Sequence, residues 1–147
     1  MKKQKNRWIM LFCICCNTFC FGGVYAWSAF SGELANYMGW DYSKVTVAYS
    51  IMLMCVALMG LVGGMLLQRF GARKLMIAAG IMWGLGWFAT GMAGSIIMLY
   101  ASFGILAGCA SGFGYNPGVV TAVSWFPDKK GFASGMAVGT CGMASLI

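Results

Sequence analysis

Charged residues divide this sequence into long uncharged segments, and the lengths of these segments constrain the fold more than any other feature. Segments 8–30 and 45–67 contain 23 residues each, and segment 75–127 contains 53. A helix needs about 20 apolar residues to cross a bilayer, so each of the first two segments predicts one crossing. At about 1.5 Å per residue the third segment is long enough for two crossings, with a turn at Gly94 and Ser95.

The sequence therefore predicts an all-α integral membrane protein. Only 9% of the residues are charged and 61% are hydrophobic, whereas a soluble domain carries about 25% charged residues. The first apolar segment is too long for the core of a signal peptide, so it is expected to remain as a helix. We expect four complete membrane-spanning helices and the start of a fifth, at about 8–30, 45–67, 75–93, 97–123 and 132–147. The last segment is too short to cross a bilayer, so we expect the chain to be a fragment of a longer protein.

The distribution of charge predicts the orientation of these helices. Four basic residues open the chain and three lie in segment 69–74, whereas the expected loop 31–44 has a net charge of −1. The four at the amino terminus are Lys2, Lys3, Lys5 and Arg7. Because loops rich in Lys and Arg stay in the cytoplasm, we expect a multi-pass protein of the cell membrane with a cytoplasmic amino terminus. The basic residues lie in separate clusters and form no stripe, so no nucleic-acid partner is expected.

Side chains that support catalysis or metal binding are scarce in this sequence. Histidine is absent, which removes His-based metal sites, His general bases and Ser-His-Asp triads. The cysteines lie in apolar stretches and are interpreted as small apolar residues within helices. They are Cys13, Cys15, Cys16, Cys20, Cys55, Cys109 and Cys141. We therefore expect no enzymatic activity, no cofactor and no metal site.

Glycine recurs every fourth residue in several of the expected helices. Such faces allow the backbones of membrane helices to approach closely, so helix packing is the expected role. The repeats are Gly60 and Gly64, Gly80 and Gly84, Gly104, Gly108 and Gly112, and Gly131, Gly135 and Gly139. Pro117 leaves a backbone carbonyl unpaired in the fourth helix and is expected to bend it.

Two motifs resemble those of the major facilitator superfamily. Between the second and third helices, segment 64–74 resembles the family's cytoplasmic motif G-x-L-a-D-R-x-G-R-R/K. The matching residues are Gly64, Leu66, Arg69, Gly71, Arg73 and Lys74, and Gly71 is expected to make a tight turn. Gln68 replaces the usual Asp, which puts the family role of that acid in doubt here. Segments 25–30, 112–117 and 125–135 are similar to the oxalate:formate antiporter-like branch, which shows Y-x-W-[ST]-x-[FY] and W-F-P-D-[KR]-R-G-[LF]-A-[ST]-G.

This resemblance implies part of the amino-terminal six-helix bundle of a twelve-helix secondary transporter. Its expected function is the transport of small organic anions by alternating access, with lipid, the anion and the missing carboxyl-terminal half as partners. The resemblance also implies that the cationic residues for the anion lie in that second half. The alternative is a complete small membrane scaffold or assembly protein that oligomerises through its glycine faces.

Polar and aromatic residues within the expected helices are the candidates for substrate contact. Tyr115 and Asn116 lie beside Pro117 and are expected either to line a cavity or to bond to a neighbouring helix. Tyr25 and Trp27 lie near the outer end of the first helix, where they are either site residues or interfacial aromatic residues. No acidic or basic residue lies inside the expected spans, although a proton-coupled carrier usually keeps an intramembrane carboxylate.

Overall fold

The computed structural model describes residues 7–144, and all regular structure within this range is helical. Lys2, Lys3 and Lys5, and the last residues of the expected fifth span, lie outside the described residues. The elements are α2 (Arg7–Phe21), η1 (Gly22–Val24), α3 (Trp27–Met38), α4 (Tyr42–Phe70), α5 (Ala72–Gly91), α6 (Ile96–Leu99), η2 (Tyr100–Ala107), α7 (Gly108–Trp125), η3 (Pro127–Lys129) and α8 (Lys130–Met143).

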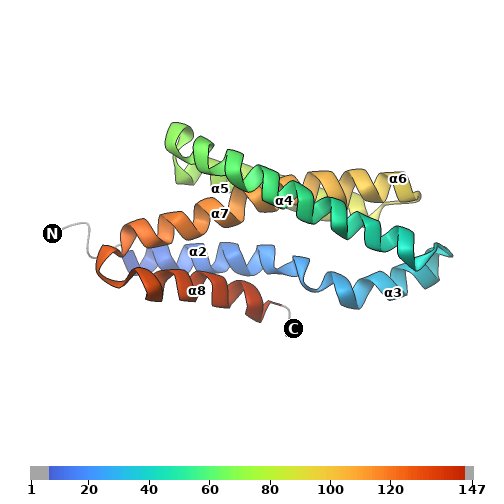
Figure 1. The fold of residues 1–147 in the computed structure, drawn as a ribbon, viewed down its shortest axis with the longest axis horizontal. Coiled ribbons are helices and arrows are strands. Elements are labelled where there is room, and N and C mark those ends of the chain that lie inside the picture. Colours follow the sequence, from blue (N-terminus) through green and yellow to red (C-terminus); the bar gives the residue numbers. More distant parts are fainter. Residues whose placement is uncertain (1–6, 145–147) are drawn as a thin grey trace.

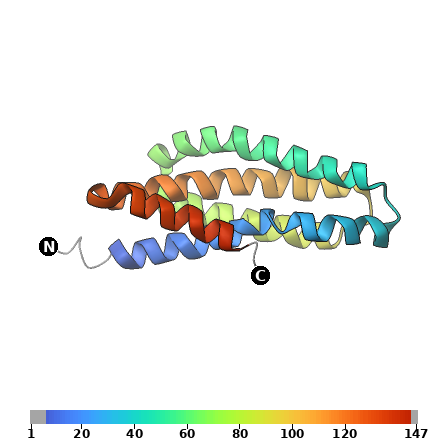
Figure 2. The same cartoon turned by 60° about the horizontal axis from the view of Figure 1, so that its bottom comes forward.

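The helices lie side by side along one direction and form an elongated bundle (Figures 1 and 2). α7 occupies its centre and packs against α2, α4, α5 and α8. The start of α2, the α4–α5 turn and the α7–α8 loop lie at one end, and the α3–α4 and α5–α6 connections lie at the other (Figure 1). Successive long helices therefore run in opposite directions along the bundle.

The first expected helix differs from the prediction in two ways. We expected one helix over 8–30 and a loop over 31–44, but the helix is interrupted after Phe21 and then continues to Met38. The interruption falls at Gly22, where a Cβ atom would overlap the backbone of Cys141 in α8. A glycine is therefore required for this close approach of the two backbones.

The prediction of a loop over 31–44 was wrong, because a charged residue does not prevent a helix where its side chain is exposed. Glu33 is exposed on α3, so its carboxylate can reach solvent from a helical backbone. α3 ends instead at Met38, and the next residue, Gly39, has φ +65°, a left-handed conformation that favours glycine. The amide N–H of Trp40 donates to the carbonyl of Ala35 over 3.0 Å and closes the helix end.

The second and third helices are joined by a shorter turn than the seven-residue loop expected between spans 45–67 and 75–93. α4 ends at Phe70, α5 begins at Ala72, and Gly71 alone connects them with φ +79°. The N–H of Gly71 donates to the carbonyl of Leu67 over 3.0 Å. The prediction that a glycine makes a tight turn here is confirmed.

The fourth expected helix, over 97–123, is continuous from Ile96 to Trp125 through α6, the π-helical segment η2 and α7. Pro117 lies inside α7. The turn that precedes Ile96, expected at Gly94 and Ser95, is confirmed. The Ser95 side chain accepts from the Met98 N–H over 3.3 Å at the start of the helix.

Three helices of the described chain are long and apolar enough to cross a membrane. They are Arg7–Met38, Tyr42–Phe70 and Ile96–Trp125. α5, the expected third crossing, is a 20-residue helix outside this set, and it begins with the charged residues Arg73 and Lys74. The structure thus confirms a helical membrane fold without fixing the number of crossings.

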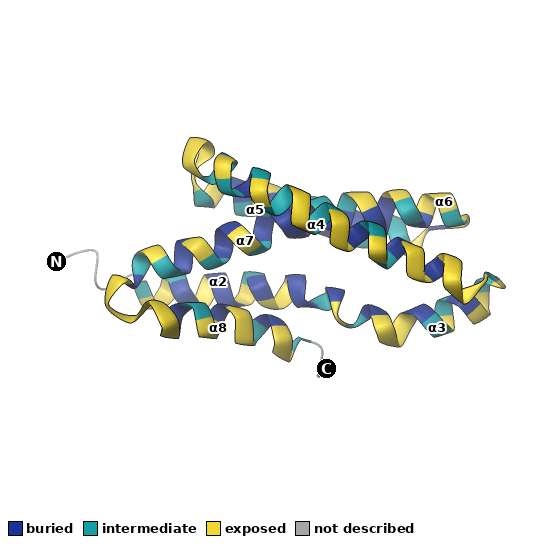
Figure 3. Cartoon of the chain, in the orientation of Figure 1, coloured by how far each residue is buried: buried dark blue, intermediate teal, exposed yellow. Residues whose placement is uncertain are grey.

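Burial is organised around α7, and the outer faces of the helices are exposed (Figure 3). Many of the exposed side chains are large and apolar. Phe12, Phe88 and Ile97 are 71%, 70% and 76% exposed. A water-soluble surface rarely gathers large apolar side chains in this way, whereas lipid accommodates them.

Candidate functional site

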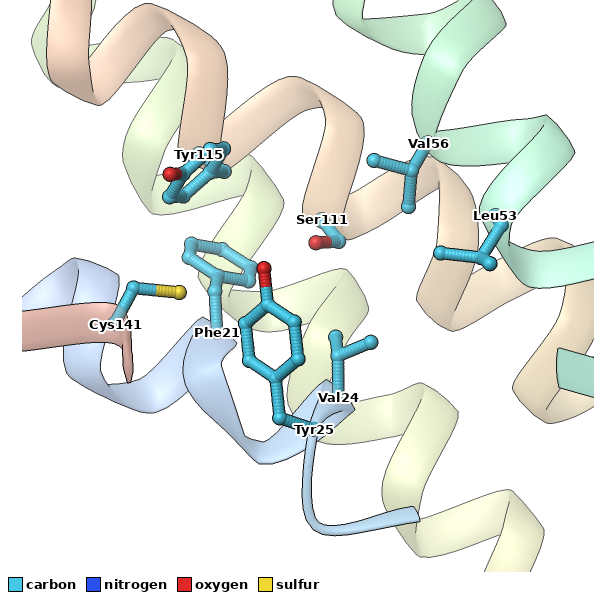
Figure 4. Close-up of a pocket in the computed structure, with 8 residues that line it drawn as sticks. All are labelled: Phe21, Val24, Tyr25, Leu53, Val56, Ser111, Tyr115 and Cys141. Atoms are coloured by element: carbon cyan, nitrogen blue, oxygen red, sulfur yellow. The ribbon is translucent and has the colours of Figure 1, made fainter. Parts of the chain in front are cut away.

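A small cavity of about 90 Å³ lies where η1, α4, α7 and α8 meet (Figure 4). It brings together Tyr25 and Tyr115, two of the residues expected to contact substrate. Its lining consists of Phe21, Val24, Tyr25, Leu53, Val56, Ser111, Tyr115 and Cys141. Residues 90 positions apart in the sequence therefore face one space.

The break between α2 and α3 positions Tyr25. Because the chain turns immediately after η1, the Tyr25 side chain rises into the cavity and its hydroxyl points toward Ser111 (Figure 4). A continuous helix would direct this side chain differently, since each residue rotates the direction by about 100°. The interruption that the sequence did not predict thus contributes to the site.

Phe21 lies between the rings of Tyr25 and Tyr115 (Figure 4). Its ring fits here because Gly114 has no side chain, and a Cβ atom on Gly114 would overlap the ring. On its other side Phe21 makes an edge-to-face contact with Trp83, with ring centroids 5.2 Å apart. These contacts hold the aromatic wall in place.

The polar groups of this cavity are neutral. Tyr25, Ser111 and Tyr115 contribute hydroxyl groups, Cys141 contributes a thiol, and no charged side chain belongs to the lining. Hydroxyl groups can donate to a carboxylate oxygen, and no carboxylate in the lining repels an anion. The lining therefore offers hydrogen-bond donors without a charge of either sign.

Sequence reasoning missed Ser111, although a signal was available. Ser111 precedes Tyr115 by four residues, a spacing that places both side chains on one face of a helix. Cys141 and Leu53 carried no such signal, because their contribution depends on how α8 and α4 dock against α7.

Trp27 lies near this cavity but does not line it. Its indole is 5% exposed and stacks on Phe103, with ring centroids 3.8 Å apart and an angle of 18° between the rings. Trp27 borders a second cavity, of about 320 Å³, between α3 and α4. Tyr25 borders both cavities.

Asn116 does not share the cavity of Tyr115. It is exposed and lies against α4 at Gly60, where a Cβ atom would overlap its side-chain amide. Consecutive residues of a helix point about 100° apart, so Tyr115 and Asn116 face different neighbours. The structure separates the two members of this expected pair.

The residues of the loop motif surround the α4–α5 turn. Gln68 and Arg69 belong to the last turn of α4, and the Arg69 guanidinium lies 5.8 Å from the ring centroid of Phe70. Arg73 borders a third cavity, between α2 and α5, together with Asn17. A Cβ atom at Gly64 would meet no described atom within 4 Å, so this glycine is not used for packing inside the described chain.

An ion pair at the same end joins the start of α2 to the loop after α7. An Nη atom of Arg7 lies 3.6 Å from an Oδ atom of Asp128, and the guanidinium lies 5.6 Å from the ring centroid of Phe126. At the opposite end Lys44 Nζ lies 2.9 Å from Asp41 Oδ2. The hydrogen bond from Lys44 and then its charge lower the pKa of the exposed Asp41 carboxyl group.

Among residues 7–144 no group of three metal-binding side chains comes together, and the seven cysteines are free. The described helices thus form an apolar bundle of the kind that multi-pass membrane proteins have, with a cavity that carries three hydroxyl groups. The chain belongs to the Major Facilitator Superfamily, whose sequence profile matches residues 7–147.

Three curated relatives indicate which members of this family the chain is similar to. The MFS-type transporter YhjX of Escherichia coli (strain K12), named as uncharacterized, is 36% identical over 143 residues, which are 97% of this chain and 36% of that protein. The oxalate:formate antiporter of Oxalobacter formigenes is 32% identical over 142 residues, 96% of this chain and 34% of that protein. Monocarboxylate transporter 3 of Mus musculus is 29% identical over 131 residues, 88% of this chain and 27% of that protein.

These matches confirm the resemblance drawn from the two motifs. The relatives are named as transporters or antiporters and not as enzymes. The chain spans about a third of their length or less.

Proposed function

We propose that this chain forms part of the amino-terminal helix bundle of a secondary transporter that exchanges small organic anions by alternating access. The observation that carries this proposal is the meeting of Tyr25, Ser111 and Tyr115 in one cavity without a charged side chain. The names of the relatives, an oxalate:formate antiporter and a monocarboxylate transporter, supply the substrate class. In such transporters substrate binds between two helix bundles near the bilayer midplane.

The proposed topology has four complete crossings, with α5 as the third and the amino terminus in the cytoplasm of a cell. Support comes from the charges at the two ends of the bundle. The end that holds the α4–α5 turn carries Arg7, Arg69, Arg73, Lys74, Lys129 and Lys130 against Asp128. The opposite end carries Glu33, Asp41 and Lys44. The first end is the more basic and is therefore assigned to the cytoplasm.

In the proposed site the hydroxyl groups of Tyr25, Ser111 and Tyr115 donate to the carboxylate of the anion. The lining offers no positive charge, so the balancing cation is assigned to the part of the transporter that closes over this cavity. Asn116 is assigned to the contact between α7 and α4 at Gly60, because it lies there and not in the cavity.

The alternative, a scaffold that oligomerises through glycine faces, is not better supported. The face of Gly104, Gly108 and Gly112 is already covered by α4 within the chain. Two other repeats, Gly80 with Gly84 and Gly131 with Gly135 and Gly139, have no described neighbour within 4 Å of an added Cβ atom, but an uncovered stripe of glycines does not identify an assembly.

Counterflow in proteoliposomes tests the proposal. The full-length product of the gene that encodes these residues should exchange internal unlabelled formate for external labelled oxalate, and the 147-residue chain alone should not, because only one wall of the site is present. The variant Tyr37→Phe is a suitable control, since Tyr37 is 87% exposed and borders neither tyrosine cavity. Absence of exchange of oxalate, formate and lactate by the full-length product would contradict the proposal.

A further inference from the structure

The contact between α4 and the helix Ile96–Trp125 has a regular register. Three glycines of this helix each lie against the α4 residue that precedes them by 53 positions, with 2.8 to 2.9 Å between an added Cβ atom and the α4 side chain. The pairs are Ile51 with Gly104, Cys55 with Gly108, and Met59 with Gly112. A separation that stays constant over two turns means that the two helices run in the same direction. The register therefore places Cys55 beside Cys109, the residue that follows Gly108.

Gly108 brings the two backbones close together at this point. A Cβ atom added to Gly108 would lie 2.8 Å from Cys55 Cβ and 3.2 Å from Met52 Cα. Helices in contact through ordinary side chains keep their axes about 8–10 Å apart, whereas glycine permits a closer approach. The thiol groups of Cys55 and Cys109 interact across this contact, and both are free. Two thiols from different helices thus meet without a bond between them.

The pair lies apart from the Tyr25–Tyr115 cavity. Neither cysteine belongs to the lining of that cavity. Cys109 lies two residues before Ser111, so the two side chains leave the helix about 200° apart. Both cysteines are half-buried, and both lie inside helices that are long and apolar enough to cross a membrane. A small reagent that dissolves in the membrane should therefore reach them.

We propose that Cys55 and Cys109 form a redox-modification site, at which a lipid-soluble organic disulfide oxidises the two thiols to a disulfide that joins α4 to α7. The inference does not rest on the proposed transport function. The close approach at Gly108 matters here because a disulfide requires Cα atoms about 4.4–6.8 Å apart, which is less than the usual separation of two helices.

The reaction proceeds in two exchange steps. One cysteine, as its thiolate, attacks the organic disulfide, forms a mixed disulfide and releases one organic thiolate. The second cysteine then attacks the sulfur of the first, forms the S–S bond between the helices and releases the second organic thiolate. The two thiol protons pass to the two released thiolates. The cysteines together lose two electrons, and the organic disulfide gains them.

The cross-link should stabilise the bundle, because it restricts the unfolded chain between the two cysteines. Closing a loop of this kind should raise the midpoint of thermal denaturation by about 5 °C or more. Treatment with dithiothreitol should reverse the shift, since it reduces the disulfide to the two thiols. The stability of this part of the protein would then depend on the redox state of its surroundings.

Peptide mapping by mass spectrometry tests the site in the full-length product. The protein in liposomes is treated with dithiodipyridine, a lipid-soluble organic disulfide, and is then digested without reduction. We expect a linked peptide pair that contains Cys55 and Cys109, and no retained pyridine group on either cysteine. Cys16 is exposed on α2 and reports that the reagent has reached the bundle, because it should carry a pyridine adduct.

Two variants provide matched controls. Cys55→Ser removes one thiol, so Cys109 should keep its pyridine adduct and the denaturation midpoint should not rise. Met54→Cys in the Cys55→Ser background moves the thiol by one residue, to a position that is 66% exposed. One residue turns the direction of a side chain by about 100°, so this thiol should form an adduct without a link to Cys109.

Three outcomes would overturn the site. The first is an adduct on Cys16 without any link between Cys55 and Cys109. The second is equal cross-linking of Cys109 by the cysteine at position 54. The third is a link that lowers the denaturation midpoint, since it would show that the thiols must be pulled together. Counterflow is measured separately, so none of these results bears on the transporter assignment.

Discussion

The two sides of the helix that runs from Ile96 to Trp125 are built differently. Toward α4, Gly104, Gly108 and Gly112 leave no room, because a Cβ atom on any of them would lie within 3.0 Å of an atom of α4. Toward η1 and α8, Ser111 and Tyr115 border an open cavity. We call the side toward α4 the packed side, and the side toward η1 and α8 the hollow side because it borders the cavity.

This difference shows that one membrane helix can use one side for packing and the other for ligand contact. Lipid supplies no hydrophobic drive for helix association, so close van der Waals contact of small residues holds α7 against α4. Hydroxyl groups are costly in such contacts unless they are satisfied, and they remain on the side where a ligand or water can reach them. The packed side should thus control stability, and the hollow side should control ligand affinity.

Gly112→Ala should give the largest effect, on the packed side. The added methyl group would lie 2.8 Å from Met59 Cβ and 2.9 Å from the Val56 carbonyl oxygen. Because a backbone cannot yield as a side chain can, we expect a loss of about 1–3 kcal/mol in stability. The measurement is the midpoint of thermal denaturation of the 147-residue chain in detergent, and an unchanged midpoint would show that α4 and α7 are not in close contact.

Tyr115→Phe should give the next effect, on the hollow side. The substitution removes one hydroxyl and keeps the ring, so the denaturation midpoint should stay within error. If Tyr115 donates to the anion, the apparent affinity of the full-length product should fall by about 1–2 kcal/mol. The test is the concentration dependence of oxalate counterflow, with Tyr115→Ala as a comparison that should also lower stability. Unchanged affinity in the Phe variant would remove Tyr115 from the site.

The division between the two sides could be read from the sequence only in part. The repeat of Gly104, Gly108 and Gly112 predicted a packed face because its period matches a helix, and Gly71 predicted the tight turn because its neighbours already matched a motif. Glu33 misled the prediction, since a charged residue at an exposed position does not end a helix. The meeting of Tyr25 with Tyr115 was not predictable, because it depends on the interruption after Phe21 and on the docking of α8.

The glycines of α8 provide the smallest expected effect and the sharpest control. Gly131, Gly135 and Gly139 repeat the spacing of the packed face, yet a Cβ atom on any of them would meet no described atom within 4 Å. Gly135→Ala makes the same chemical change as Gly112→Ala without the contact. In the 147-residue chain its effect should lie within about 0.5 kcal/mol, as for an exposed substitution, and thermal denaturation in the same detergent measures it. A loss as large as that of Gly112→Ala would mean that glycine is required by the helix itself and not by its neighbour, and the distinction between packed and open faces would fail. If Gly135→Ala destabilises the full-length product and not the 147-residue chain, the face of α8 is a contact surface for residues that the shorter chain lacks.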